Sequence, residues 1–497
     1  MLWPFHFLHS VCISIVYRLY PRMQCQTYNI LPTIQMIFFF FIFQGILGDC
    51  YYLGALSVVS THQTMLFDLF PDIDADLVVQ NNSVAGTPTG EQQANAEGLY
   101  AVRFWREGQW RIVIVDDLIP CNSSGRPCFA QLPEHGCEIW VLIAEKAFAK
   151  LNGSYESIVA GQENEALADI TGGLPQDYKL RGIDADSDLS ETVLWNKLIA
   201  HSDANEINLV CASTFQDGNE EAKNEDDQIG SGTPSIGKGM ECNRNNCGIM
   251  SGHAYGIVDL KEIRFNEQVL KMIKIRNPWG KGEEWNGAFC DSDVNRWNQI
   301  DQTIQTEMGF CNDDDGAWWM TFYDFYKHYD VVNVCRILRQ PHWTGHHATG
   351  EWFGDLLPGG QTSYRNSQYQ LMVHEDSTVF INVGRPSSRA RNEKYMFGIG
   401  PLVEYCSGPA PARCGKRMYD VGLTKHRQAA KLEVDRECCV EIQVKKSDRP
   451  YLIVCAFVFG LYCCCYYNYC FPHNVVWDLY VIVCDRVWSC VIVFDRV

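Results

Sequence analysis

One short stretch, QGILGDCYYLGAL at residues 44–56, constrains this chain more than any other feature. Glycines and a polar pair interrupt an apolar run there, and apolar residues with helical spacing follow at Leu53, Leu56 and Val59. We therefore expect a helix that begins at Cys50. Unpaired amide groups and the helix dipole favour a thiolate at such a start, so the pattern is typical of a cysteine nucleophile.

Gln44 lies close enough to Cys50 for a folded-back loop to direct its side-chain amide toward an oxyanion formed at the cysteine. The backbone N–H of Cys50 would supply a second donor. The alternative is that Cys50 is one of 23 cysteines and fills a small apolar space, as most isolated cysteines do.

Two later stretches favour the catalytic interpretation. SGHAYGIV places His253 at the start of an expected strand, and KIRNPWG ends another expected strand at Asn277. A histidine base and a residue that orients it would complete the arrangement around a nucleophile. The cysteine comes first and the other two lie far along the chain, an order typical of papain-like enzymes with a cleft between two lobes.

At these residues the chain resembles the calpains, which are papain-like cysteine proteases with a calcium-dependent protease core. The matching strings occur in family order and are QGILGDC, AEKAFAKLNGSYES, DITGG, SGHAYGI and IRNPWG. The resemblance implies four catalytic positions: Cys50 as nucleophile, His253 as general base, Asn277 as the residue that orients the imidazole, and Gln44 as an oxyanion donor. It also implies that Trp279 walls the site from water. The chain departs from the family at Tyr51, where the family usually has tryptophan.

The resemblance further implies calcium, which prefers hard oxygen ligands. In the second lobe the matching acids are Glu284, Asp291 and Asp315, but Ala317 stands where another acid is expected. One carboxylate fewer should weaken this site. The alternative is that these residues are ordinary surface acids.

In the first lobe Glu138 matches an expected calcium ligand, whereas Phe41 replaces the expected aspartate. We expect that site to be disrupted. The sequence contains no EF-hand loop pattern, so the C-terminal calcium module common in the family is missing from it.

The net charge and the cysteine content restrict the classes of partner and the cellular compartments expected for this chain. The 41 Lys and Arg residues are outnumbered by 60 Asp and Glu residues, which gives a net charge of −19 and argues against nucleic acid as a partner. The cysteines show no regular spacing, which argues against a disulfide scaffold and favours a reducing cytoplasm. Protein substrates are the expected partners, and a regulatory subunit is neither indicated nor excluded.

The expected fold class is α+β, with a papain-like two-lobed cysteine protease core followed by an antiparallel β-sandwich. The expected units are an atypical N-terminal segment (1–43), a first lobe with the nucleophile helix (44–160), a second lobe, mostly β, with the histidine and asparagine (161–338), a calpain-type β-sandwich (339–450) and an atypical apolar, cysteine-rich tail (451–497).

Within the first lobe, alternation predicts paired strands that bury Val102 and Phe104 with Ile112 and Ile114 on one face. A helix is expected from about Glu138 to Lys150, with its apolar residues on one side.

The tail begins with 21 uncharged residues, YLIVCAFVFGLYCCCYYNYCF. Its length permits a transmembrane helix, and the cluster Cys463, Cys464 and Cys465 permits acylation near a membrane. Its aromatic and β-branched content instead favours strands. Membrane contact through this tail or through the β-sandwich therefore stays an alternative to a purely cytoplasmic location.

Two functions remain open from the sequence. The first is a cysteine endopeptidase that performs limited, calcium-modulated proteolysis of intracellular proteins through a Cys-His-Asn acyl-enzyme mechanism. The second is a catalytically weak or inactive scaffold of the same fold that binds partners. The complete set of catalytic residue types favours the first.

Overall fold

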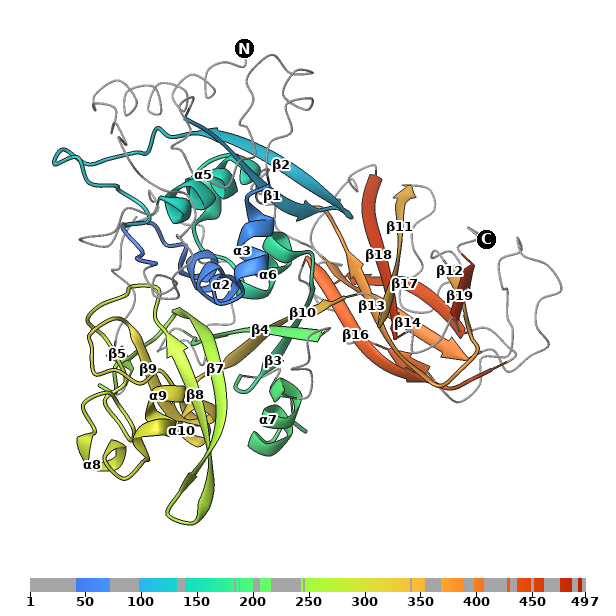
Figure 1. The fold of residues 1–497 in the computed structure, drawn as a ribbon. Coiled ribbons are helices and arrows are strands. Elements are labelled where there is room, and N and C mark those ends of the chain that lie inside the picture. The colour runs from blue at the N-terminus through green and yellow to red at the C-terminus, as the bar shows by residue number, and fades with distance from the viewer. Residues whose placement is uncertain are drawn as a thin grey trace.

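The computed structural model shows a helical first lobe, a second lobe built on a sheet, and a C-terminal part with two more sheets (Figure 1). It describes residues 42–71, 98–131, 139–182, 185–186, 188–199, 206–215, 243–244, 246–339, 342–353, 368–387, 389, 397–405, 427–429, 436–447, 451–459, 474–484 and 490–493. Phe41, Glu138 and the three adjacent cysteines of the tail lie outside the described residues, as does nearly all of the segment 1–43.

The first lobe is organised around the helix expected at Cys50. Its helices are α2 (Cys50–Ser60), α3 (Gln63–Leu69), α5 (Trp140–Asn152) and α6 (Glu163–Thr171), with the 3₁₀ helix η1 (Glu156–Ile158) between the last two. Helix α6 follows the boundary predicted at residue 160, but its apolar residues belong to the core of this lobe. The predicted apolar positions Leu53, Leu56 and Val59 are fully buried. Helix α2 packs against α3, α5 and α6 and against strands of the second lobe, so the helix that begins at Cys50 lies at the centre of the core.

The paired strands expected in this lobe are confirmed, but their predicted common buried face is wrong. Strands β1 (Leu99–Arg106) and β2 (Gln109–Asp116) are antiparallel, and Val102 lies opposite Val113. Ile112 and Ile114 therefore point to the other face, where they are 50% and 39% exposed. The register across the turn, which alternation within each strand does not specify, decides this outcome.

Helix α5 was predicted to be apolar on one side, and it is buried on almost all sides. Every residue from Trp140 to Ala149 is buried, including Glu145 and Lys146. The helix ends where Gly153 adopts a positive φ of 107°, a conformation that suits glycine. Two charged side chains are therefore carried into the interior and must find polar partners there.

The second lobe is an antiparallel sheet around an aromatic core, as expected. The sheet order among the described strands is β3 (Leu174–Lys179), β10 (Val331–Leu338), β4 (Glu206–Ser213), β7 (Ala254–Phe265), β8 (Gln268–Arg276) and β9 (Ala317–Thr321). A small sheet of β5 (Asn243–Arg244) and β6 (Ile249–Met250) and the helices α7 (Glu191–Ile199), α8 (Val294–Trp297), α9 (Gln302–Glu307) and α10 (Phe322–His328) complete the lobe. Trp195, Trp318 and Phe322 are among the aromatic residues buried on the sheet.

The C-terminal part contains two antiparallel sheets. One has the described strands β11 (Trp343–Phe353), β18 (Asn474–Cys484), β13 (Ser377–Gly384) and β16 (Glu437–Val444). The other has β15 (Arg427–Ala429), β14 (Phe397–Tyr405), β17 (Tyr451–Phe459), β12 (Gln368–Val373) and β19 (Cys490–Val493). Apolar side chains from both sheets, such as Ile381 and Ile453, share one buried cluster.

Strands on both sides of residue 450 belong to these sheets. Strand β17 pairs with β14 and β12, and β18 pairs with β11 and β13. The β-rich alternative for these parts of the tail is thus the one observed. In the described residues we find no helix with the length and apolar character needed to cross a membrane.

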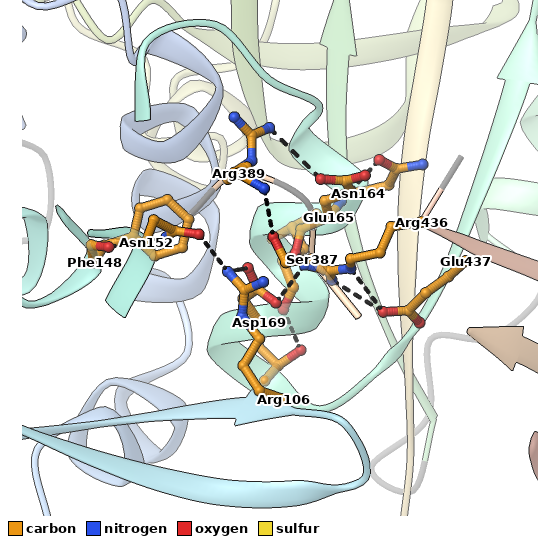
Figure 2. A network of polar contacts seen from close by, with 12 residues as sticks. Arg106, Phe148, Asn152, Asn164, Glu165, Asp169, Ser387, Arg389, Arg436 and Glu437 are labelled. Atoms are coloured by element: carbon orange, nitrogen blue, oxygen red, sulfur yellow. Dashed lines mark hydrogen bonds and ion pairs between the residues drawn. The ribbon is translucent and has the colours of Figure 1, made fainter. Parts of the chain in front are cut away.

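A network of buried charges connects the C-terminal part to the first lobe (Figure 2). Asp169 of α6 forms ion pairs with Arg106 at the end of β1, at 2.6 Å, and with Arg436 beside β16, at 2.7 Å. Nearby, Arg389 donates a hydrogen bond to the carbonyl of Ala160 at 2.6 Å, and its guanidinium lies over the ring of Tyr51. The C-terminal part therefore contacts the residue that follows Cys50.

Candidate active site

Cys50 is the first residue of α2 and is half-buried, whereas the rest of the helix is buried. The carbonyl of Asp49 accepts hydrogen bonds from the amides of Tyr52 and Leu53, at 2.9 and 3.1 Å. The helix thus starts where the sequence predicted, and it presents the one partly accessible residue of its first turn.

His253 is held at the start of β7 by its backbone. Its amide donates to Thr214 Oγ1 at 3.2 Å, and its carbonyl accepts from the amide of Thr214 at 3.1 Å. The side chain is 1% exposed, and its ring lies edge-on to Tyr255, with the two centroids 4.9 Å apart. The imidazole is therefore fixed by the second lobe's sheet.

The His253–Asn277 pair expected from the sequence is present. His253 Nε2 and Asn277 Oδ1 are 2.9 Å apart. The orientation of the Asn277 amide is set independently, because Oδ1 accepts from the amide of Trp279 at 3.0 Å and Nδ2 donates to the carbonyl of Glu283 at 3.3 Å. Nε2 must then donate to Oδ1, which makes Nδ1 the proton-accepting nitrogen of the neutral imidazole.

The two lobes meet at these residues. Helix α2 packs on β7, and a Cβ on Gly256 would collide with Ser57 on the helix. The amide of Gln44 donates to the carbonyl of Pro278 at 2.8 Å, which ties the loop before Cys50 to the turn after Asn277. Residues separated by some 200 positions in the sequence are thus joined by direct contacts.

Gln44 is 8% exposed, and its Nε2 donates to the carbonyl of Leu47 at 2.6 Å. An amide nitrogen carries two hydrogens, so this bond orients the side chain and leaves the second hydrogen for another acceptor. Trp279 is half-buried, and its ring centroid lies 4.8 Å from that of His253. It therefore lies next to the imidazole, where a residue that shields the site from water is expected.

Comparison with known proteins gives the family. A sequence pattern described as "Calpain family cysteine protease" matches residues 24–336, which is more than half of the chain. The chain belongs to the calpain family of cysteine proteases. The match begins inside the segment 1–43 that we interpreted as atypical.

Individual calpain relatives cover most of the chain. It is 33% identical to the calpain-type cysteine protease DEK1 of Zea mays over 430 residues, which are 83% of this chain and 17% of that protein. It is 28% identical to calpain-9 of Mus musculus over 383 residues, and 30% identical to calpain-14 of Homo sapiens over 380 residues. These alignments cover 73% and 72% of this chain but 49% and 48% of the two relatives, so the chain spans about half the length of the animal calpains.

The three second-lobe acids that the calpain resemblance implies as calcium ligands, Glu284, Asp291 and Asp315, lie near one another. Burial and the neighbouring charges of Glu284 and Asp315 raise the pKa of Asp291 to about 8. Asp291 is 7% exposed, and no donor in the described part of the chain reaches either of its carboxylate oxygens. Glu284 accepts a hydrogen bond from the amide of Gly316, and Asp315 accepts one from the amide of Ala317.

The burial of the carboxyl groups of Asp49 and Glu145 was missed by the sequence analysis. Asp49 and Glu145 are 0% and 2% exposed, and burial raises the pKa of both carboxyl groups, that of Asp49 to about 7. The contact of Thr214 with the backbone of His253 was also missed. An acid within the apolar helical segment WVLIAEKAF was the available signal for Glu145, whereas no sequence signal placed it beside Asp49.

Proposed function

We propose that this calpain-family chain is a cysteine endopeptidase in which Cys50, His253 and Asn277 carry out peptide hydrolysis. The observation that supports this most directly is the hydrogen bond between His253 Nε2 and Asn277 Oδ1, because it leaves Nδ1 to accept a proton. The N-terminal position of Cys50 on α2 supplies a favourable place for a thiolate.

The proposed reaction has two halves. Proton transfer from Cys50 to His253 gives a thiolate, which attacks the carbonyl carbon of the substrate and forms a C–S bond. The amide C–N bond then breaks, and the amine leaves with the proton from His253. Water attacks the thioester while His253 takes its proton, and the thiol is restored as the acid product leaves. Gln44 and the amide of Cys50 would stabilise the oxyanion in both halves.

Active-site labelling tests this function in the full chain. We expect a peptidyl epoxide to modify Cys50 selectively, because an activated thiolate reacts faster than an ordinary thiol. Cys311 is the internal control, since it is exposed but lies in surroundings that raise its pKa. Mass spectrometry of the labelled protein, together with cleavage of unfolded casein with and without calcium, gives the measurement.

The labelling pattern separates the two candidate functions. Selective labelling of Cys50 with casein cleavage supports the endopeptidase. The opposite result is faster labelling of the exposed Cys311 than of Cys50, with no casein cleavage in the presence or absence of calcium. That result would favour a scaffold of the calpain fold instead.

We also propose that calcium modulates the enzyme through Glu284, Asp291 and Asp315. The unpaired, buried carboxylate of Asp291 fits a cation, because a positive ion would replace the missing donors and lower the pKa that burial and the neighbouring acids raise. The fit is incomplete, since no three His, Cys, Asp or Glu side chains of the described residues are arranged to hold a metal by themselves. Backbone carbonyls or water would have to complete the ligand set.

Restoring the missing acid tests the calcium proposal. We expect Ala317→Glu to lower the calcium concentration needed for half-maximal binding, measured by titration calorimetry, and for half-maximal casein cleavage, because an added carboxylate strengthens an oxygen site. Ala317→Gln is the matched control, since it adds an oxygen of similar reach without the charge. Identical calcium titrations for the two variants and the original chain would refute the site.

For the C-terminal part we propose a β-sandwich that braces the protease core. The buried cluster shared by its two sheets supports the sandwich, and the ion pairs between Arg436, Asp169 and Arg106 support the bracing role. We also propose the division into units that the sequence predicts and protein substrates as the partners. We further propose a cytoplasmic location, with contact to membranes through the C-terminal part.

A further inference from the structure

A small cavity lies where the C-terminal part meets the first lobe, beside the ion pairs of Asp169 (Figure 2). Its volume is about 20 Å³, which is room for one particle of the size of a water molecule or a monatomic ion. Charged and polar side chains from both parts of the molecule line it. They include Arg106 and Asp169 of the first lobe and Arg385, Ser387, Arg436 and Glu437 of the C-terminal part.

Three of the lining side chains are buried arginines. Arg106 ends β1, Arg385 follows β13 and Arg436 precedes β16, and they are 7%, 6% and 3% exposed. A guanidinium group stays charged in a protein, so the lining carries three positive charges where little water reaches them. Burial lowers the pKa of Arg106, and although Asp169 raises it, the charge of Arg436 lowers it again. An anion among these groups would therefore be stabilised by them.

The acids of the lining are already engaged. Asp169 uses its two oxygens for separate arginines, at 2.6 and 2.7 Å. Glu437 uses Oε1 for an arginine at 3.0 Å and Oε2 for the amide of Asn382 at 2.8 Å. Glu107 is 39% exposed and forms an ion pair with Arg111 at the surface. Three guanidinium charges thus line the cavity against two largely buried carboxylates, and the buried lining is net positive.

Arg106 also presents a buried donor to be satisfied. Its Nη2 donates to Asn152 Oδ1 at 3.0 Å and lies 2.6 Å from Asp169 Oδ2. No acceptor in the described part of the chain reaches its Nε, although that atom is buried. A buried N–H group without an acceptor costs free energy. A particle in the cavity that accepts hydrogen bonds would remove this cost.

We propose that the cavity binds one halide ion, such as chloride, between the C-terminal part and the first lobe. The charge of the lining selects an anion, and the small volume excludes phosphate, sulfate and carboxylates, which have several heavy atoms each. Water fits the same space, but it does not offset the positive charge. Because arginines of both parts line the cavity, the ion binds only when the two parts are in contact, and its binding stabilises that contact.

Thermal unfolding of the full chain in different salts tests the site in solution. Chloride or bromide is compared with gluconate at equal ionic strength and without calcium, so that screening of surface charges is the same. Gluconate is too large for the cavity. We expect the melting midpoint to be higher in either halide by roughly 1–3 °C, and this rise to saturate with halide concentration.

Bromide also locates the ion. In crystals of the full chain grown with bromide, we expect an anomalous peak in the cavity beside Arg106. A peak with equal midpoints in bromide and gluconate would mean an adventitious ion only, bound at crystal concentration, and would overturn the proposal. Absence of the peak, with water or nothing in the cavity, would overturn it whatever the melting curves show.

Ser387 provides a matched pair of variants. Ser387→Asp places a carboxylate in the lining, where it can take over the role of the ion. We expect this variant to have a raised midpoint in gluconate and a smaller rise in halide. Ser387→Ala leaves the arginines unchanged and should keep the halide response of the original chain. The same halide response in Ser387→Asp as in the original chain would place the ion elsewhere and refute the site. None of these measurements depends on peptidase activity, so they stand if the proposed function fails.

Discussion

Replacing Cys50 by alanine should reduce peptide hydrolysis by roughly 10⁴–10⁶-fold, because the nucleophile and its base act as a unit. His253→Ala should have an effect of similar size. Asn277→Ala should cost roughly 10²–10⁴-fold, since the imidazole would lose the bond to Oδ1 that fixes its tautomer while the nucleophile remains. Initial rates of casein cleavage measure the three losses.

The graded order is what distinguishes a catalytic triad from general damage to the fold. Cys439→Ala, which changes a half-buried cysteine in the C-terminal sheets, is the matched control and should leave the rate unchanged. Circular dichroism should show that each variant is folded. Retention of hydrolysis by Cys50→Ala would contradict the mechanism, and equal rates for Asn277→Ala and the original chain would contradict the role of Asn277.

Replacing Asp169 by alanine should lower the free energy of unfolding by about 3–5 kcal/mol, since it leaves Arg106 and Arg436 buried without the acid between them (Figure 2). All three side chains are less than a tenth exposed, so water cannot replace the lost partner. Arg436→Leu should cost less, because Asp169 keeps its pair with Arg106. Thermal or urea unfolding of the full chain measures both losses.

An exposed pair of the same C-terminal part provides the control. Lys445 and Asp376 form an ion pair whose side chains are 80% and 60% exposed, so Lys445→Ala should leave the unfolding midpoint unchanged. If Asp169→Ala also leaves the midpoint unchanged, the buried ion pairs do not brace the two parts of the molecule. A loss of casein cleavage in Arg436→Leu that exceeds its loss of stability would indicate that the brace also supports the active site.

The local elements that carry the proposed catalytic residues could be predicted because each residue stands in a short pattern with its own local cause. The helix at Cys50 follows from glycines and apolar spacing, and the strands that begin after His253 and end before Asn277 follow from their β-branched runs. Exposure of Ile112 and Ile114 could not be predicted in the same way. Alternation shows that a strand has two faces, but the partner's register decides which face is buried.

The tail illustrates a second limit. The composition of its apolar run is compatible with either a membrane helix or a strand. Hydrogen-bonded pairing with other strands decides between the two. In the structure β17 lies between β14 and β12, so its backbone groups are satisfied by strands distant in sequence. Such long-range pairing leaves no trace in the local pattern.

By itself the sequence determined the types and order of the proposed catalytic residues, the helix that begins at Cys50 and the membership in the calpain family. Only the tertiary structure decided which charged side chains are buried together. Asp169 lies between two arginines, because packing brings separate helices and strands into contact. Burial and distance set the strength of these interactions, and both are properties of the folded chain rather than of any segment.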